Sequence, residues 1–131
     1  MAKLINNQLA FVSMMAMNEA LAIGVKAGID PVLLREIVRA SSGNSFAWDA
    51  GAAAVLKDRL PPRFTVTLAC KDIGLAQQLA HENDVDTPMG RVAHDLLERY
   101  RVEGFAQEDV LATIKAVEER SRAEVRGTWH D

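Results

Sequence analysis

The longest apolar pattern of the chain begins at its second residue. From about Ala2 to Ala27, apolar side chains occupy every side of a helix, and no charge occurs between Leu4 and Asn18. Because a helix that is apolar all round is normally buried all round, the pattern predicts one long, fully buried helix at the centre of the domain. Gly28 follows as the predicted helix stop.

The same stretch raises the question of a membrane-spanning helix. It contains Asn6, Asn7, Gln8 and Ser13, whereas a spanning helix needs about 20 mainly apolar residues. It also lacks the small-residue cleavage pattern of a secretory signal peptide. We therefore predict a helix buried inside protein, no membrane association and a cytoplasmic location.

Five shorter segments with helical spacing follow, separated by turn residues. Asp30-Pro31 and Thr87-Pro88 each combine a capping residue with a proline that fits the first helical position. No segment alternates strictly between apolar and polar residues, so the pattern predicts an all-α bundle around one long central helix. The predicted helices cover about 31–40, 46–57, 65–83, 88–101 and 108–122, and 123–131 is expected to be frayed.

Composition sets the size and excludes several functions. The 131 residues, 49% hydrophobic and 25% charged, predict a single all-α domain over 1–131. A net charge of −3 and seven aromatic residues exclude a nucleic-acid-binding surface. No two of the eight glycines lie two positions apart, so neither a Rossmann fingerprint nor a phosphate-binding P-loop can form. His81, His94 and His130 lack ligand spacing, and Cys70 is the single cysteine, so no metal site and no internal disulfide are expected.

Polar residues stand at the start of the long apolar helix. Lys3 and Asn7 are four residues apart and share one face, with Asn6 beside them. Polar groups on an apolar helix need partners or a wet cleft, and a lysine beside a cleft can move protons. The alternative is a solvated lysine with two amides near a helix end.

Three other features leave two interpretations open. Lys71-Asp72 lies within an apolar helix face and is either part of a site or an exposed polar stripe. The hydroxyl-rich loop 41–45 could bind an anion or could cap helices. Cys70 is predicted to be a small buried residue, with a reactive thiol beside Lys71 as the alternative.

Three segments occur in a recognisable order: Lys3-Leu4-Ile5-Asn6-Asn7, then Ser41-Ser42-Gly43-Asn44-Ser45, then Phe64 followed by Leu68-Ala69-Cys70-Lys71-Asp72-Ile73-Gly74-Leu75-Ala76. Together they resemble the C-terminal helical domain of the β-hydroxyacid dehydrogenase family, which includes 3-hydroxyisobutyrate dehydrogenases and tartronate semialdehyde or glyoxylate reductases. The resemblance covers about 2–118. It implies a fold like the C-terminal half of 6-phosphogluconate dehydrogenase-like enzymes.

The resemblance also implies roles for substrate-binding residues. Lys3 corresponds to the catalytic lysine that takes the hydroxyl proton and returns it in the reverse direction. Asn7 corresponds to the asparagine that binds the substrate and orients the lysine, with Asn6 as its neighbour. Phe64 corresponds to an aromatic residue that closes over the site, and the loop 41–45 would border the cleft.

The implied cofactor is NAD or NADP, with Lys71 reaching it and Asp72 beside it. The family's nucleotide-binding Rossmann domain is not in this sequence, so we expect weak or no cofactor binding by this chain alone and an incomplete active site. The expected partners are a β-hydroxyacid or its semialdehyde, and either a separate nucleotide-binding domain or further copies of the chain. The alternative function is a non-catalytic helical self-association module that retains relics of the site.

Overall fold

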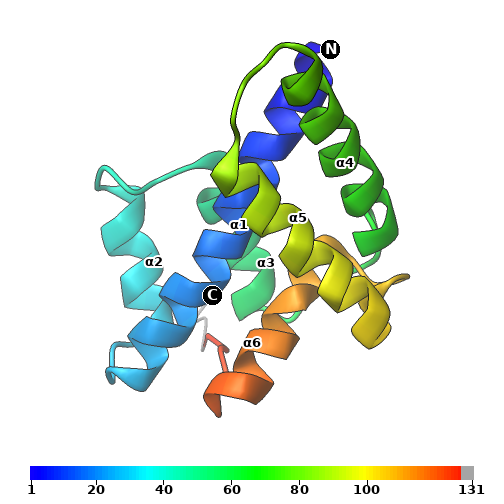
Figure 1. Ribbon diagram of the computed structural model, residues 1–131. Helices are drawn as coiled ribbons and strands as arrows, with labels where there is room; N and C mark the ends of the chain where they lie inside the picture. The colour runs from blue at the N-terminus through cyan, green and yellow to red at the C-terminus, as the bar shows by residue number, and fades with distance from the viewer. Residues whose placement is uncertain (128–131) are drawn as a thin grey trace.

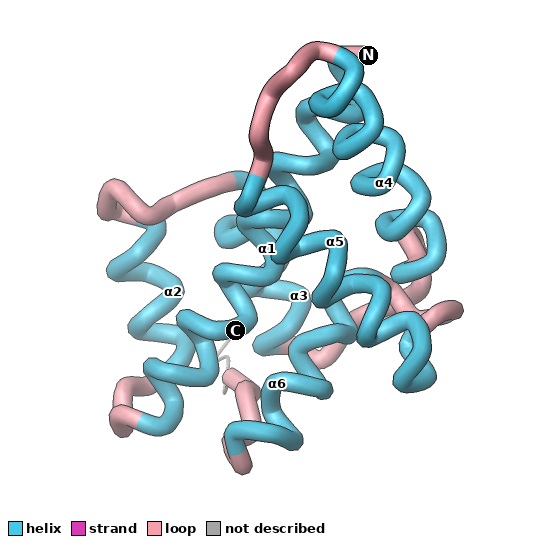
Figure 2. The backbone as a smooth tube through the Cα atoms, in the orientation of Figure 1, coloured by secondary structure: helices cyan, strands magenta, loops and turns pink. Residues whose placement is uncertain are grey.

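The computed structural model describes residues 1–127 and is all-helical (Figures 1 and 2). In this range β structure is limited to one bridge between Thr65 and Asp109. The prediction of an all-α bundle is therefore confirmed. The α-helices are α1 (Ala2–Lys26), α2 (Pro31–Arg39), α3 (Ala53–Leu56), α4 (Val66–Glu82), α5 (Pro88–Tyr100) and α6 (Ile114–Ser121); the π-helices are η1 (Ala47–Ala52) and η2 (Arg101–Phe105), and η3 (Val110–Thr113) is a 3-10 helix.

Helix α1 runs through the middle of the molecule and packs against α2, η1, α4, α5 and α6 (Figure 1). Its buried side chains join two apolar clusters, one shared with α4 and α5 and one shared with η1, α3 and α6. The long central helix is thus confirmed as the element that both halves of the core share. The largest fully buried apolar side chains are Leu21, Leu56, Ile73, Leu97 and Ile114.

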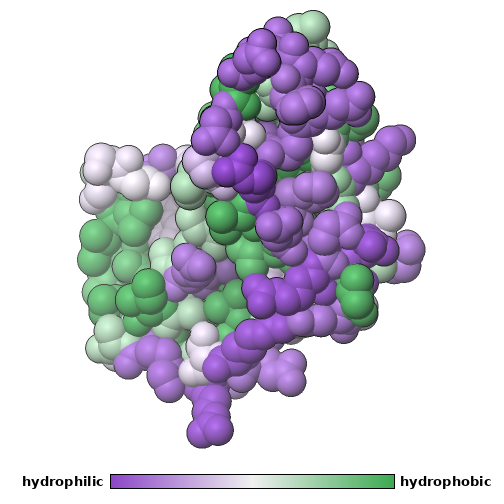
Figure 3. Space-filling model, viewed as in Figure 1, coloured by the Kyte–Doolittle hydropathy of each residue, from purple (hydrophilic) through white to green (hydrophobic). Residues whose placement is uncertain are grey.

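The prediction that α1 is buried on all sides is wrong. Ile5, Leu9 and Ile23 are 60%, 68% and 68% exposed, because the other elements leave one side of the helix uncovered. By length and composition α1 could cross a membrane, and 39% of its most apolar window is buried. One such helix near the N-terminus is weak evidence, because the core helix of a soluble protein and a signal sequence pass the same test. Figure 3 shows a further apolar surface over α2, where Leu33 and Ile37 are exposed.

Helix ends follow the local signals in most places. Asp30 caps α2 by accepting a hydrogen bond from the Leu33 amide at 3.0 Å, as its position before a proline predicts. Gly28 ends the α1 region with φ near +85°, a conformation that favours glycine. Thr87 differs, because its hydroxyl makes no cap and donates instead to Gln77 on α4.

Two predicted segments have a different local structure. The segment predicted as a helix over 46–57 is a π-helix followed by one short α-helix, and the segment over 108–122 starts only at Val110, as a 3-10 turn. The frayed end is also wrong where the structure describes it. Val125 is fully buried and its amide donates to the Glu118 carboxylate, while the Gly127 amide donates to the Leu56 carbonyl. The remainder of that prediction, 128–131 with His130, lies outside the described residues.

Asp109 ties the connection before α4 to the segment before α6. It is 6% exposed, and its carboxylate accepts hydrogen bonds from three backbone amides, those of Leu111 at 2.9 Å, Arg63 at 3.1 Å and Phe64 at 3.0 Å. Backbone bonds on either side, including the Val110 amide to the Phe64 carbonyl, complete the junction. Since Phe64 and Arg63 lie 45 and 46 residues from Asp109 in the sequence, these bonds fix where α4 begins.

We expect Asp109→Ala to lower the free energy of unfolding by about 2–4 kcal/mol, because it leaves three part-buried backbone amides without an acceptor. Urea denaturation followed by circular dichroism measures this. Asp86→Ala is the matched control, since Asp86 forms only an exposed ion pair with Arg91, and such pairs contribute about 0–1 kcal/mol. Equal losses in the two variants would contradict the role given to Asp109.

Candidate functional site

The structure brings the two separate polar motifs of the sequence into contact. The Asn7 side-chain amide on α1 donates a hydrogen bond of 2.8 Å to the Asp72 carboxylate on α4. Both side chains are half-buried, and the two residues are 65 positions apart in the sequence. Asn6 lies on the exposed side and donates to the Asn7 oxygen at 3.3 Å. The bond fixes the orientation of the Asn7 amide.

Lys3 and Lys71 flank this hydrogen-bonded pair along their respective helices. Lys3 is one turn before Asn7 on α1, and Lys71 directly precedes Asp72 on α4. Both lysines are exposed, and neither forms an ion pair with an acidic side chain within residues 1–127. Their ammonium groups are therefore available to an anionic ligand.

Phe64 lies at the entrance to α4 and is half-buried. Its ring packs against that of Phe11 on α1, with centroids 5.6 Å apart and planes tilted by 46°. The Phe64 backbone amide donates a hydrogen bond to the Asp109 carboxylate, and this bond fixes the backbone that carries the ring. Asp109 is the residue near the candidate site whose importance the sequence pattern did not indicate.

The loop 41–45 lies on the other side of α1 from α4 (Figure 1). The Ser41 hydroxyl donates to the Ile37 carbonyl at 2.6 Å, and the Ser45 hydroxyl accepts from the Trp48 amide at 3.0 Å. These bonds fit the helix-capping interpretation of the loop. The structure does not bring the loop together with Asn7 and Asp72.

A polar network next to the candidate site was not predicted. The Gln77 amide donates to the Gln8 oxygen at 2.6 Å, and the Thr87 hydroxyl donates to the Gln77 oxygen at 3.0 Å. A side chain at Gly90 would collide with both glutamines, so a glycine lets α5 approach the α1–α4 contact. In the sequence, this network is indicated only by one polar amide on each helix, Gln8 on α1 and Gln77 on α4.

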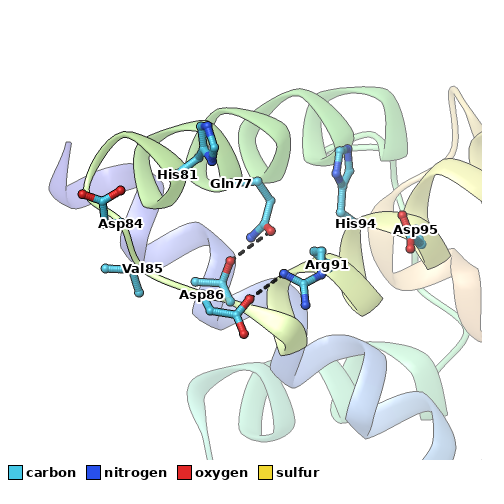
Figure 4. Close-up of a pocket in the computed structure, with 9 residues that line it drawn as sticks. Gln77, His81, Asp84, Val85, Asp86, Arg91, His94 and Asp95 are labelled. Atoms are coloured by element: carbon cyan, nitrogen blue, oxygen red, sulfur yellow. Dashed lines mark hydrogen bonds and ion pairs between the residues drawn. The ribbon is translucent and has the colours of Figure 1, made fainter.

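Gln77 and Thr87 also line a surface hollow of about 560 Å³ between α4 and α5 (Figure 4). His81, His94 and Arg91 line it together with acidic residues, and Arg91 forms an ion pair with Asp86 at 2.7 Å. None of the six residues with implied roles lines it. Within the described residues no three His, Cys, Asp or Glu side chains are placed to hold a metal ion.

Cys70 is buried on α4, which confirms it as a packing residue. Burial raises the pKa of its thiol to about 11, and the nearby Glu98 carboxylate acts in the same direction. The thiol is therefore protonated over the physiological range, and a nucleophilic role beside Lys71 has no support.

Comparison with known proteins extends these observations. Residues 1–117 match the protein family described as NAD-binding of NADP-dependent 3-hydroxyisobutyrate dehydrogenase. The chain is 35% identical over 126 residues to 2-(hydroxymethyl)glutarate dehydrogenase of Eubacterium barkeri, a match that covers 95% of this chain and 42% of the relative.

Two solved structures share the fold. The 3-hydroxyisobutyrate dehydrogenase of Salmonella typhimurium superimposes with a TM-score of 0.81 at 29% identity, over 88% of this chain and 40% of that one. The Mycobacterium tuberculosis 3-hydroxyisobutyrate dehydrogenase with L-serine superimposes with a TM-score of 0.77 at 25% identity, over 88% and 42%. The chain thus spans about two fifths of the length of each of these relatives.

The fold and these matches define a helical domain of the NAD(P)-dependent oxidoreductases. The chain belongs to the 3-hydroxyisobutyrate dehydrogenase family and corresponds to the C-terminal NAD-binding domain of its members.

We expect the Cys70 thiol to react with a disulfide reagent at pH 8 about a hundredfold more slowly than an unperturbed cysteine, because a raised pKa lowers the thiolate fraction. The rate should increase as the pH approaches 11. The urea-unfolded chain is the control and should react at the ordinary rate. Fast reaction of the folded chain at pH 8 would contradict the prediction that burial keeps the Cys70 thiol protonated.

Proposed function

We propose that this chain provides the proton-transfer lysine and the substrate-orienting amide of an NAD(P)-dependent dehydrogenase that oxidises a β-hydroxyacid or reduces its semialdehyde. The observation that carries the proposal is the hydrogen bond between Asn7 and Asp72, which joins the Lys-x-x-Asn-Asn segment to the Lys-Asp segment. Random placement of polar residues on two helices would rarely pair these two motifs.

The substrate class rests on the chemistry of the relatives. The Eubacterium barkeri relative is named for 2-(hydroxymethyl)glutarate, and the Mycobacterium tuberculosis structure contains L-serine. Both compounds carry a hydroxyl group on the carbon β to a carboxylate. A substrate of this kind offers one proton for a base and one carboxylate for a cation.

Lys3 is the base in this proposal. Its side-chain nitrogen accepts the proton of the substrate hydroxyl during oxidation and returns it during reduction. The nicotinamide, when bound, supplies the hydride acceptor. Asn7 is held by Asp72 and its oxygen accepts a hydrogen bond from Asn6, which leaves its second amide hydrogen and one oxygen lone pair for the substrate. Phe64 covers the substrate from the start of α4.

Lys71 and Asp72 are the contacts that we propose between this chain and a nicotinamide dinucleotide. The exposed Lys71 ammonium, without an ion pair among residues 1–127, suits a phosphate or carboxamide oxygen, and Asp72 lies beside it. The pyrophosphate of a dinucleotide is normally held by a glycine turn at a helix N-terminus, and the sequence contains no Gly-x-Gly. Most of the cofactor contacts therefore belong to a nucleotide-binding unit outside this sequence.

A second candidate function has one observation in its favour. Ile5, Leu9, Val12 and Ala16 form a stripe on α1, and Met89 and Val92 on α5 lie beside it; we call this surface the α1–α5 face. Exposed apolar surfaces of this kind mark association sites. We propose that a second copy of the chain binds to the α1–α5 face. The domain would then self-associate either as part of a cytoplasmic enzyme or as a non-catalytic association module.

A chimera tests the catalytic proposal. It joins the remaining part of the Salmonella typhimurium relative to this chain at Met1, and oxidation of β-hydroxyacids is followed by nicotinamide absorbance. We expect Lys3→Ala to lower kcat by ~10²–10⁴, the range of a general acid or base, with little change in cofactor affinity. Lys26→Ala, at the other end of α1, should leave turnover unchanged. An active chimera with an unaffected Lys3→Ala variant would contradict the catalytic role.

The same chimera separates the role of Lys71 from that of Lys3. We expect Lys71→Ala to raise the KM for the cofactor more than it lowers kcat, because the ammonium binds the cofactor and takes no part in proton transfer. Steady-state kinetics with the cofactor as varied substrate measures both values. A loss confined to kcat would assign Lys71 to the chemical step.

The isolated chain is expected to bind NAD or NADP weakly or not at all, since it lacks a pyrophosphate cradle. Isothermal titration calorimetry measures this, with the chimera as the positive control. A Kd below about 1 µM, roughly −8 kcal/mol, would show that the helical domain is sufficient for binding.

Self-association is tested by light scattering at tens of micromolar chain. We expect Leu9→Glu combined with Val92→Glu to shift the chain to monomer, because two charges then oppose burial of the α1–α5 face. Ile37→Glu is the matched control, since Ile37 is exposed on α2 and lies off that face. A wild-type chain that is already monomeric would count against the module.

A further inference from the structure

A hollow of about 420 Å³, whose lining includes none of the six residues with implied roles, lies between α3, the segment 57–63 and η3. Three basic residues line it: Lys57, Arg59 and Arg63. Asp109 is the acidic residue among the lining side chains. The whole chain has a net charge of −3, so this cluster of three basic residues is opposite in sign to the net charge of the protein.

The acidic groups nearest in sequence are already engaged. The Asp109 carboxylate accepts three backbone amide hydrogen bonds, which stabilise its charge. Asp58 interacts with Arg126 at 3.7 Å. The Arg59 and Arg63 guanidinium groups form no ion pair with an acidic side chain in the described part of the chain.

The backbone that carries the two arginines is fixed on both sides of the hollow. Asp58 adopts a left-handed conformation with φ of 51°, and the Arg59 amide folds back to donate to the Ala54 carbonyl on α3 at 3.0 Å. The Arg63 amide donates to the Asp109 carboxylate at 3.1 Å. Because both backbones are held, little main-chain ordering would oppose ligand binding.

The other walls of the hollow are apolar. They are formed by Ala53, Ala54, Leu60, Pro61 and Leu111. A lining that combines two guanidinium groups with apolar side chains matches a ligand with an oxyanion at one end and a compact hydrocarbon body at the other.

We propose that this hollow is a binding site for a small organic anion, a carboxylate or phosphate ester with an apolar body. The site shares no lining residue with the Asn7–Asp72 pair of the α1–α4 contact, and the proposal does not depend on the proposed dehydrogenase function. Arg59 and Arg63 bind the anionic group, and the alanine and leucine side chains contact the apolar body.

The test is an NMR titration of the full chain with phenyl phosphate, benzoate and phenol, followed on the backbone amides of 53–63 and 109–111. We expect both anions to give saturable shifts with a Kd below about 10 mM, and phenol, which has the same body without a charge, to give none. The tighter anion identifies the preferred oxyanion. Absence of saturable shifts with both anions, or equal shifts with phenol, would overturn the proposal.

Variants locate the site. We expect Arg59→Gln combined with Arg63→Gln to weaken anion binding by about tenfold or more, as expected for lost charge-assisted hydrogen bonds. Lys26→Gln combined with Lys115→Gln removes the same charge elsewhere and should leave binding unchanged. If circular dichroism shows that the double variant is unfolded, Arg59→Gln alone replaces it and is expected to weaken anion binding as well. Equal weakening by both double variants would show only a general charge effect and would overturn the site.

Discussion

The antiparallel packing of α1 against α4 is the interaction on which the candidate site depends. At one level of this contact Asn7 bonds to Asp72, and further along the Phe11 ring packs on Phe64. The apolar contact between Phe11 and Phe64 sets the distance between the helices. The Asn7–Asp72 bond fixes their register, because a half-buried carboxylate that lost its amide partner would lose a hydrogen bond without full access to water. A shift of one helix by a turn would separate both pairs, so the geometry of the site follows from the core.

Local signals predicted the helices well and their environments less well. A proline after a capping aspartate predicts the start of α2 because cap and proline act within one turn. The exposure of Ile5, Leu9 and Ile23 could not be predicted, because an apolar helix surface has the same sequence pattern whether it packs against this chain or another. The candidate residues were found through the family resemblance, since spacing alone favoured a solvated lysine and an exposed polar stripe.

Asp109 shows the other limit of sequence reasoning. In the sequence it occupies the first turn of a predicted helix, where a negative charge is ordinary. In the structure its carboxylate also accepts from the Arg63 and Phe64 amides, which approach only after the chain has folded back on itself. A hydrogen bond between residues 45 positions apart produces no periodic pattern in the sequence. Only the structure shows that this buried carboxylate fixes the start of α4.

The exposed side of α1 and its polar end can serve two different contacts. At about 100° per residue, Ile5 lies roughly 160° around the helix from Lys3, whereas Asn7 lies close to Lys3 on the side toward α4. A second copy seated on the α1–α5 face would therefore leave Lys3 open, and a nucleotide-binding unit over Lys3 and Lys71 would leave that face free. Proton transfer needs a site from which water is excluded, and the exposure of both lysines means that this chain does not exclude it alone. Self-association on that face would not replace a nucleotide-binding unit in excluding water from Lys3, because it would cover the opposite side of the same helix.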